Sequence, residues 1–182
     1  MKGKTSVKTQ TVRSAKELAR TAVFVAAVIG VQYALSALPF VEIVTLLFAC
    51  YAYVFGGVRG VVAAVAFSFL RQLIFGFYPV VLILYVVHFS FLSLLFGALR
   101  RSKLSGWKLI FTSVLVAAAA TACFTLLDNI LTPVYYGYTP KAAKMYFMAS
   151  LPFLMGQTIC AGVSVGALFL PIVKAMFFVK IA

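Results

Sequence analysis

The sequence predicts an all-α integral membrane protein, a compact bundle of six transmembrane helices with both termini in the cytoplasm. Of its 182 residues, 64% are hydrophobic and 10% are charged, and the mean hydropathy is +1.10. Soluble domains are about 45–50% apolar and about 25% charged. Since one helix needs about 20 apolar residues to cross a bilayer, the chain has room for about six crossings. This composition excludes soluble enzymes, disordered proteins and disulfide-stapled scaffolds.

Two regions follow from the charge pattern: a basic segment at residues 1–17 and a single membrane domain at residues 18–182. Pro39 is expected to end the first span, because its ring cannot continue a helix. Gly56 and Gly57 indicate a tight turn before the third span. Pro79 suits the first turn of the fourth span. The six expected spans are residues 18–38, 41–55, 61–77, 79–99, 109–131 and 145–178.

Two of the connections have a distinct composition. Residues 100–108 form a basic loop, and residues 132–144 form a longer connection with two prolines, a glycine and three tyrosines. If the N-terminus is cytoplasmic, all but three of the 16 Lys and Arg residues fall on the cytoplasmic side; the exceptions are Arg71, Lys141 and Lys144. Lys and Arg concentrate in cytoplasmic loops. The net charge of +13 therefore indicates membrane topology and not a nucleic-acid partner.

Polar side chains inside the apolar spans are the candidate ligand-binding residues, because such groups are costly in a bilayer. Most of them fall in the outer half of the expected bundle. On the fourth span, Tyr78, Tyr85 and His88 share one helix face. Aromatic walls with a few polar groups suit a flat, ring-bearing small molecule. The candidates from this argument are Glu42, Arg71, Gln72, Tyr78, Tyr85, His88, Asp128, Asn129, Tyr136 and Gln157.

The charged candidates also have structural interpretations. Arg71 can form a structural ion pair with Glu42 or Asp128, and that role can coexist with ligand binding. Asp128 can instead cap the turn that follows it. These alternatives stay open at the level of the sequence.

The uncharged candidates have alternatives of the same kind. His88 can be a core histidine whose nitrogens are satisfied inside the bundle. Tyr136, with Tyr135 and Tyr138, can belong to an aromatic belt at the membrane interface. Gln157 can hold two helices together by hydrogen bonds.

Small residues recur at four-residue spacing along the first span. Ala15 and Ala19 form one such pair, and Ala22 and Ala26 form another that continues to Gly30. Such stripes let helices approach closely. They indicate either packing within this bundle or docking against another membrane subunit.

The sequence lacks catalytic motifs. It has no P-loop, no H-E-x-x-H and no G-x-S-x-G. Three acidic residues and one histidine are too few for a membrane hydrolase or a metal enzyme. The three cysteines form no C-x-x-C pair. We therefore expect no enzyme activity, no catalytic residue, no metal site and no cofactor.

The segment LPFVEIVTLLFACYAYVFGGVRG contains a P-x-V-E-x-V-T-L pattern that includes Pro39, Glu42 and Thr45. This pattern is similar to the start of the second helix in substrate-binding S components of energy-coupling factor (ECF) transporters. Six short helices, a basic lead-in, A-x-x-x-A spacing and polar groups on the outer side extend the resemblance over residues 18–175. Thr45, which lies in this pattern, is also a candidate ligand-binding residue, although the resemblance carries no substrate-binding residue over to this chain.

The resemblance implies a division of labour between subunits. An S component captures a micronutrient from outside and then associates with a membrane coupling subunit and two ATPases to deliver it, by toppling in the bilayer. The alanine motif of its first helix would meet the coupling subunit through Ala22 and Ala26, or alternatively through Ala15 and Ala19. Outer connections near residues 39–42, 76–79 and 132–144 would close over the ligand. The implied location is the plasma membrane of a prokaryotic cell.

The expected function is therefore capture of a vitamin-like or nucleobase-like heterocycle. Glu42, Asp128 and Asn129 can bond ring nitrogens, and Arg71 or His88 can bind an anionic group on the same ligand. The alternative is a non-transport membrane scaffold or cell-shape protein of the MreD type, which has a similar length and helix count. Such a scaffold should bind no small molecule.

Overall fold

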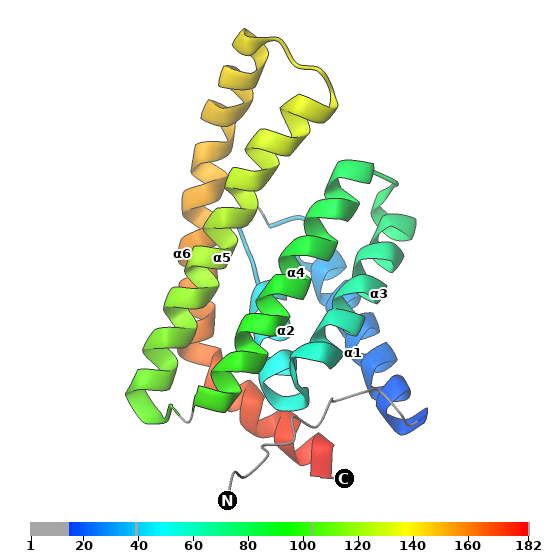
Figure 1. Cartoon of the computed structure of the whole chain (residues 1–182), viewed down its shortest axis with the longest axis vertical. Helices are drawn as coiled ribbons and strands as arrows, with labels where there is room; N and C mark the ends of the chain where they lie inside the picture. The colour runs from blue at the N-terminus through cyan, green and yellow to red at the C-terminus, as the bar shows by residue number, and fades with distance from the viewer. Residues whose placement is uncertain (1–14, 39, 103, 182) are drawn as a thin grey trace, which may run out of the picture.

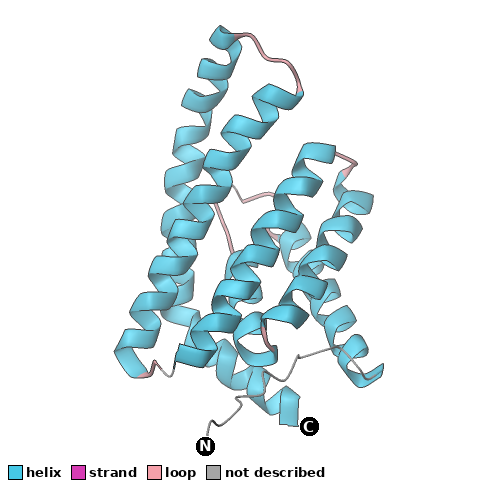
Figure 2. Cartoon of the chain, viewed as in Figure 1, coloured by secondary structure: helices cyan, strands magenta, loops and turns pink. Residues whose placement is uncertain are grey.

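A computed structural model describes residues 15–38, 40–102 and 104–181, and Figure 2 shows only helices and loops in this part of the chain. The predicted all-α class is confirmed. The elements are α1 (Ala15–Ala34), α2 (Val44–Phe55), α3 (Gly57–Phe75), α4 (Pro79–Leu99), the 3-10 turn η1 (Arg100–Ser102), α5 (Gly106–Tyr135) and α6 (Pro140–Ile181). Of the six α-helices in the described residues, five are long and apolar enough to cross a membrane, and α2 is the shorter exception. Residues 1–14 of the expected basic segment and the expected stop at Pro39 lie outside the described residues.

Several helix ends differ from the expected spans. The α5 helix continues through Pro133 to Tyr135, and α6 already begins at Pro140, so the expected long connection shrinks to residues 136–139. Proline is favourable at the first turn of a helix, and neighbouring helices make it tolerable inside membrane helices. A single residue, Gly56, separates α2 from α3. Its φ of 104° lies in the region that glycine reaches without a steric penalty.

The helices form pairs around a central short helix. Figure 1 shows α5 and α6 as a long antiparallel pair that extends beyond the α3–α4 pair. Ten of the 12 residues of α2 are buried, because α2 packs against both α4 and α6. The core around α2 contains fully buried aromatic side chains, among them Phe48, Phe67, Phe96 and Phe169.

The short α2 determines where the bundle has internal space. At 1.5 Å per residue its 12 residues span about 18 Å, whereas the hydrocarbon core of a bilayer is about 30 Å thick. The α2–α3 and α4–α5 connections, the start of α1 and the end of α6 lie at one end, called here the lower end, and the other connections lie toward the upper end (Figure 1). The space that α2 leaves open is therefore on the upper side, before Val44.

Candidate ligand-binding site

The space above α2 holds a cavity of about 340 Å³, called here the central cavity. Its wall comes from the last turns of α1, the α1–α2 connection, the ends of α3 and α4 that face upward, and the middle of α6. Its polar lining consists of Gln32, Ser36, Glu42, Arg71, Tyr85 and Gln157. The structure thus brings together Glu42, Arg71, Tyr85 and Gln157, four of the residues that the sequence singled out.

Glu42 is fixed at the start of α2. Its Oε1 accepts a hydrogen bond from the backbone N–H of Thr45 over 2.8 Å, which satisfies one of the donors that every helix leaves free in its first turn. The backbone N–H of Glu42 donates to Sγ of Cys160 on α6 over 3.3 Å. These bonds tie the α1–α2 connection to both α2 and α6. They hold a carboxylate in the wall of the central cavity.

Arg71 faces the same cavity from α3. Its guanidinium carbon lies 4.4 Å from the ring centroid of Tyr85 and 4.9 Å from that of Phe75, a cation–π arrangement. Gln32 Nε2 donates to the Tyr85 hydroxyl over 3.3 Å. Among the described residues, Arg71 forms no ion pair with either Glu42 or Asp128. The alternative of a structural ion pair for Arg71 therefore finds no support in this part of the chain.

Two polar atoms beside the central cavity have unused hydrogen-bonding capacity. Nε of Arg71 and Oε1 of Gln32 are buried and have no partner among the described residues. A buried polar group without a partner is costly, and most buried polar groups in proteins are paired. A ligand that offers an acceptor to Arg71 and a donor to Gln32 would remove that cost.

A smaller chamber of about 50 Å³ adjoins the central cavity. Glu42, Tyr85 and Gln157 line both spaces, so they form one continuous polar boundary. Thr45 and His88 line only the smaller chamber of the two. The His88 ring packs edge-to-face against Phe89 and Phe124, at 4.8 and 4.9 Å between centroids. The chamber has room for a few waters or for the tip of a ligand.

Asp128 does not share the central cavity with Glu42 and Arg71. It lines a separate cavity of about 360 Å³ between α5 and α6. Its carboxylate accepts hydrogen bonds from the hydroxyls of Thr132, over 2.6 Å, and Tyr146, over 2.7 Å. Of the candidate residues, only Gln157 lines this cavity as well as the central one. In this structure Asp128 connects two helices.

Four other candidates do not line the central cavity. Gln72 is buried, and its Oε1 accepts a hydrogen bond from the backbone N–H of Tyr78 over 3.0 Å. This bond links Gln72 of α3 to the α3–α4 connection, while the Tyr78 side chain is about half exposed. Both side-chain polar atoms of Asn129 are buried without a partner among the described residues. Tyr136 is exposed and packs against the rings of Tyr135 and Tyr138, an arrangement that suits the aromatic-belt alternative.

Phe40 covers one side of the central cavity in an uncommon backbone conformation. Its φ is +70°, which is rare for a residue with a side chain. Its ring packs 5.0 Å from that of Phe153. A Cβ at Gly156 would stand 2.7 Å from Cδ1 of Phe40, so the missing side chain of Gly156 makes room for the ring.

Phe40 and Gln32 line the central cavity, but neither was among the candidates predicted from the sequence. Gln32 was detectable as a polar side chain inside the first apolar span, whereas Phe40 is one of 18 phenylalanines.

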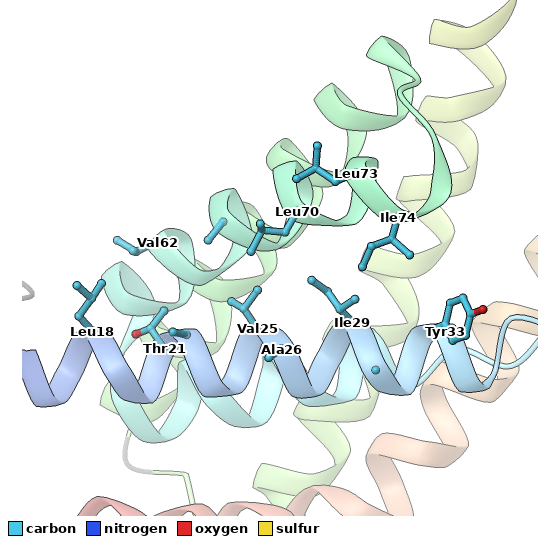
Figure 3. Close-up of a pocket in the computed structure, with 13 residues that line it drawn as sticks. Leu18, Thr21, Val25, Ala26, Ile29, Tyr33, Val62, Leu70, Leu73 and Ile74 are labelled. Carbon is cyan, nitrogen blue, oxygen red and sulfur yellow. The ribbon is translucent and has the colours of Figure 1, made fainter.

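The alanines of α1 face two different grooves. Ala22 and Ala26 line an apolar groove of about 850 Å³ between α1 and α3, called here the α1–α3 groove. Figure 3 shows Val25 and Ile29 of α1 facing Leu70 of α3 across it. Ala19 lines a separate groove of about 450 Å³ beside α2 and α6. Ala19 and the pair of Ala22 and Ala26 therefore line different grooves.

Within the described residues, no three of the His, Cys, Asp and Glu side chains lie close enough together to hold a metal ion. The central cavity offers a cation, a carboxylate, two amides and aromatic rings, and such groups can form hydrogen bonds and ring contacts with a small polar molecule. No protein-family model matches this chain, and no curated protein or solved structure matches it either.

Proposed function

We propose that the chain is the substrate-binding S component of an ECF-type importer in the plasma membrane of a prokaryotic cell. In this proposal six segments span the membrane and both termini are cytoplasmic. The protein captures a vitamin-like or nucleobase-like heterocycle from outside, and a coupling subunit with two ATPases moves it inward. The observation that carries the proposal is the central cavity of about 340 Å³ with Glu42 and Arg71 in its wall. Ionisable side chains inside a membrane bundle cost free energy, and they commonly mark functional sites. Binding of a polar ligand would explain why this bundle contains both.

The proposed ligand carries complementary groups on one small ring system. A carboxylate or another acceptor binds Arg71, whose Nε has no partner among the described residues. An N–H or amine of the ligand donates to Glu42. A ligand ring packs against the aromatic wall formed by Phe75 and Tyr85.

The size of the cavity limits the ligand. About 340 Å³ lies at the lower end of the range of about 300–1,000 Å³ that is typical of small-molecule sites. We therefore propose a ligand of one or two rings. The protein binds and releases this ligand without changing it chemically. For binding to drive transport, the loaded and empty forms must differ in their affinity for the coupling subunit.

The test is direct detection of the ligand. The purified full chain, in lipid nanodiscs, is incubated with a mixture of water-soluble vitamins and nucleobases, and native mass spectrometry reads the mass that stays bound. One bound compound of a few hundred daltons is expected. Arg71→Gln and Glu42→Gln should each weaken its retention by about tenfold or more, because each leaves a buried polar partner unmatched.

Lys144→Gln is the matched control, because Lys144 is an exposed cation on α6 that does not line the central cavity. It should bind as the unaltered chain does. If neither this mixture nor a small-molecule extract of the host leaves a bound mass, the capture proposal fails. That outcome would favour the non-transport scaffold of the MreD type.

A further inference from the structure

Basic side chains converge on the end of α2 at the lower end of the bundle. The carbonyl oxygen of Val54 accepts hydrogen bonds from Nη1 of Arg100, over 2.7 Å, and from Nζ of Lys180, over 2.8 Å. The carbonyl oxygen of Phe55 accepts one from Nη1 of Arg59 over 3.1 Å. The carbonyl end of a helix carries partial negative charge, which attracts cations. These three basic side chains and Arg20, whose Nη2 donates to the Lys180 carbonyl over 3.3 Å, are called here the basic cluster.

The basic cluster carries more positive charge than its protein neighbours offset. Glu17 is the acidic side chain at this place, and it forms an ion pair with Arg59. Burial lowers the pKa of Lys180, and repulsion from Arg100, Arg59 and Arg20 lowers it further. Within the part of the chain that the structure describes, one acidic side chain among these four cations leaves an excess that an external anion would relieve.

An apolar groove of about 450 Å³ adjoins the basic cluster, and it is called here the basic-rimmed groove. Its wall comes from α1, α2 and α6 and includes Val23, Phe24, Phe55 and Met176. Lys16 and Arg20 line it on α1. Its link to the basic cluster is direct, because Arg20 belongs to both and the ring of Phe55 lies 6.0 Å from Nζ of Lys180.

We propose that the basic-rimmed groove binds one anionic phospholipid. An acyl chain lies against Val23, Phe24 and Met176, and the phosphate lies at Lys16 and Arg20, next to the basic cluster. Basic residues beside a groove between membrane helices are a known form of anionic-lipid recognition. The larger α1–α3 groove is a contrast, since no charged side chain lines it and nothing there selects a headgroup. The charge of the rim therefore singles out the basic-rimmed groove. This proposal does not depend on the proposed transport function.

The experiment compares two lipids with the same acyl chains. The full chain in detergent is titrated with phosphatidylglycerol, which is anionic, and with phosphatidylcholine, which is zwitterionic, and native mass spectrometry counts bound lipid. Each basic residue near a headgroup favours anionic lipid by about fivefold. Two such residues should give the unaltered chain about a thirtyfold preference for phosphatidylglycerol. The Lys16→Gln/Arg20→Gln variant should lose most of that preference.

Two further variants separate a site from a general charge effect. Arg101→Gln/Lys108→Gln removes the same charge from exposed positions in η1 and in the first turn of α5 and should keep the preference. Ala19→Trp fills the basic-rimmed groove without changing any charge and should remove the bound phosphatidylglycerol, whereas Ala22→Trp in the α1–α3 groove should not. Equal binding of the two lipids by the unaltered chain would overturn the proposal. Equal loss in the Arg101/Lys108 variant, or full binding by Ala19→Trp, would overturn it too.

Discussion

Gly97 of α4 and Gly57 of α3 bring the backbones of their helices into direct contact. A Cβ added to Gly97 would stand 2.5 Å from the backbone nitrogen of Gly57 and 2.6 Å from its Cα. Small residues allow such close approach between membrane helices. This contact sets the spacing of α3 and α4 near the lower end, and these helices carry Arg71 and Tyr85 toward the central cavity.

Gly97→Ala should therefore destabilise the bundle. The clash involves backbone atoms that cannot rotate away, so α3 and α4 must separate, at a cost of about 1–3 kcal/mol. Gly30→Ala is the control, because a Cβ at Gly30 meets nothing within 4 Å, and alanine is the better helix former by about 0.5–1 kcal/mol. Unfolding by SDS in mixed micelles, followed by circular dichroism, measures both. Equal stability of the two variants would contradict the close contact.

Gln72 and Gln157 should respond differently to the same substitution. Gln72→Met removes the acceptor for the backbone N–H of Tyr78, so the free energy of unfolding should fall by about 1–3 kcal/mol. Gln157→Met changes the wall of the central cavity and should weaken ligand retention more than it lowers stability. The two measurements are SDS unfolding and native mass spectrometry. If Gln72→Met weakened ligand retention without changing the free energy of unfolding, Gln72 would belong to the ligand-binding site.

Asp128 tests how far the ligand reaches. Asp128→Ala leaves the hydroxyl of Tyr146 without its acceptor, which should lower stability by about 1–3 kcal/mol. Tyr146→Phe removes the donor of the same bond, so the two changes should be non-additive in a double-mutant cycle. A ligand that contacts Asp128 should lose affinity on Asp128→Ala even in the Tyr146→Phe background. Unchanged affinity there would confine the ligand to the central cavity.

The α1–α3 groove is the expected docking surface for the proposed coupling subunit. Ala22→Trp or Ala26→Trp places an indole in this groove and should block association with the coupling subunit while sparing ligand binding. The measurement is co-purification of membrane partners from host membranes, with ligand retention read on the same preparation. Ala19→Trp, which fills the basic-rimmed groove, is the positional control. Parallel loss of ligand and partner would count against this role.

The sequence by itself determined the helical content and the short α2. Apolar runs interrupted by Pro79 and by Gly56 leave few alternatives to helices at those places, because an uncovered backbone cannot be hydrogen-bonded in lipid. The cost of buried polar groups also identified Glu42 and Arg71 as candidates, and helical spacing identified Tyr85, but it named several other residues with them. The predicted helix ends were less accurate. The α5 helix continues through Pro133, and α6 begins at Pro140, because a membrane bundle tolerates proline better than an isolated helix does.

Only the tertiary structure decided which polar residues share a cavity. Helical periodicity gives the face of one helix, but the depth and rotation of each helix come from packing against its neighbours, as at Gly57 and Gly97. That packing places Arg71 beside Tyr85 and puts Asp128 against Tyr146, although both charged residues lie in apolar spans near the upper end. It also opened the central cavity, because α2 is too short to fill the bundle and begins beside the Glu42 carboxylate.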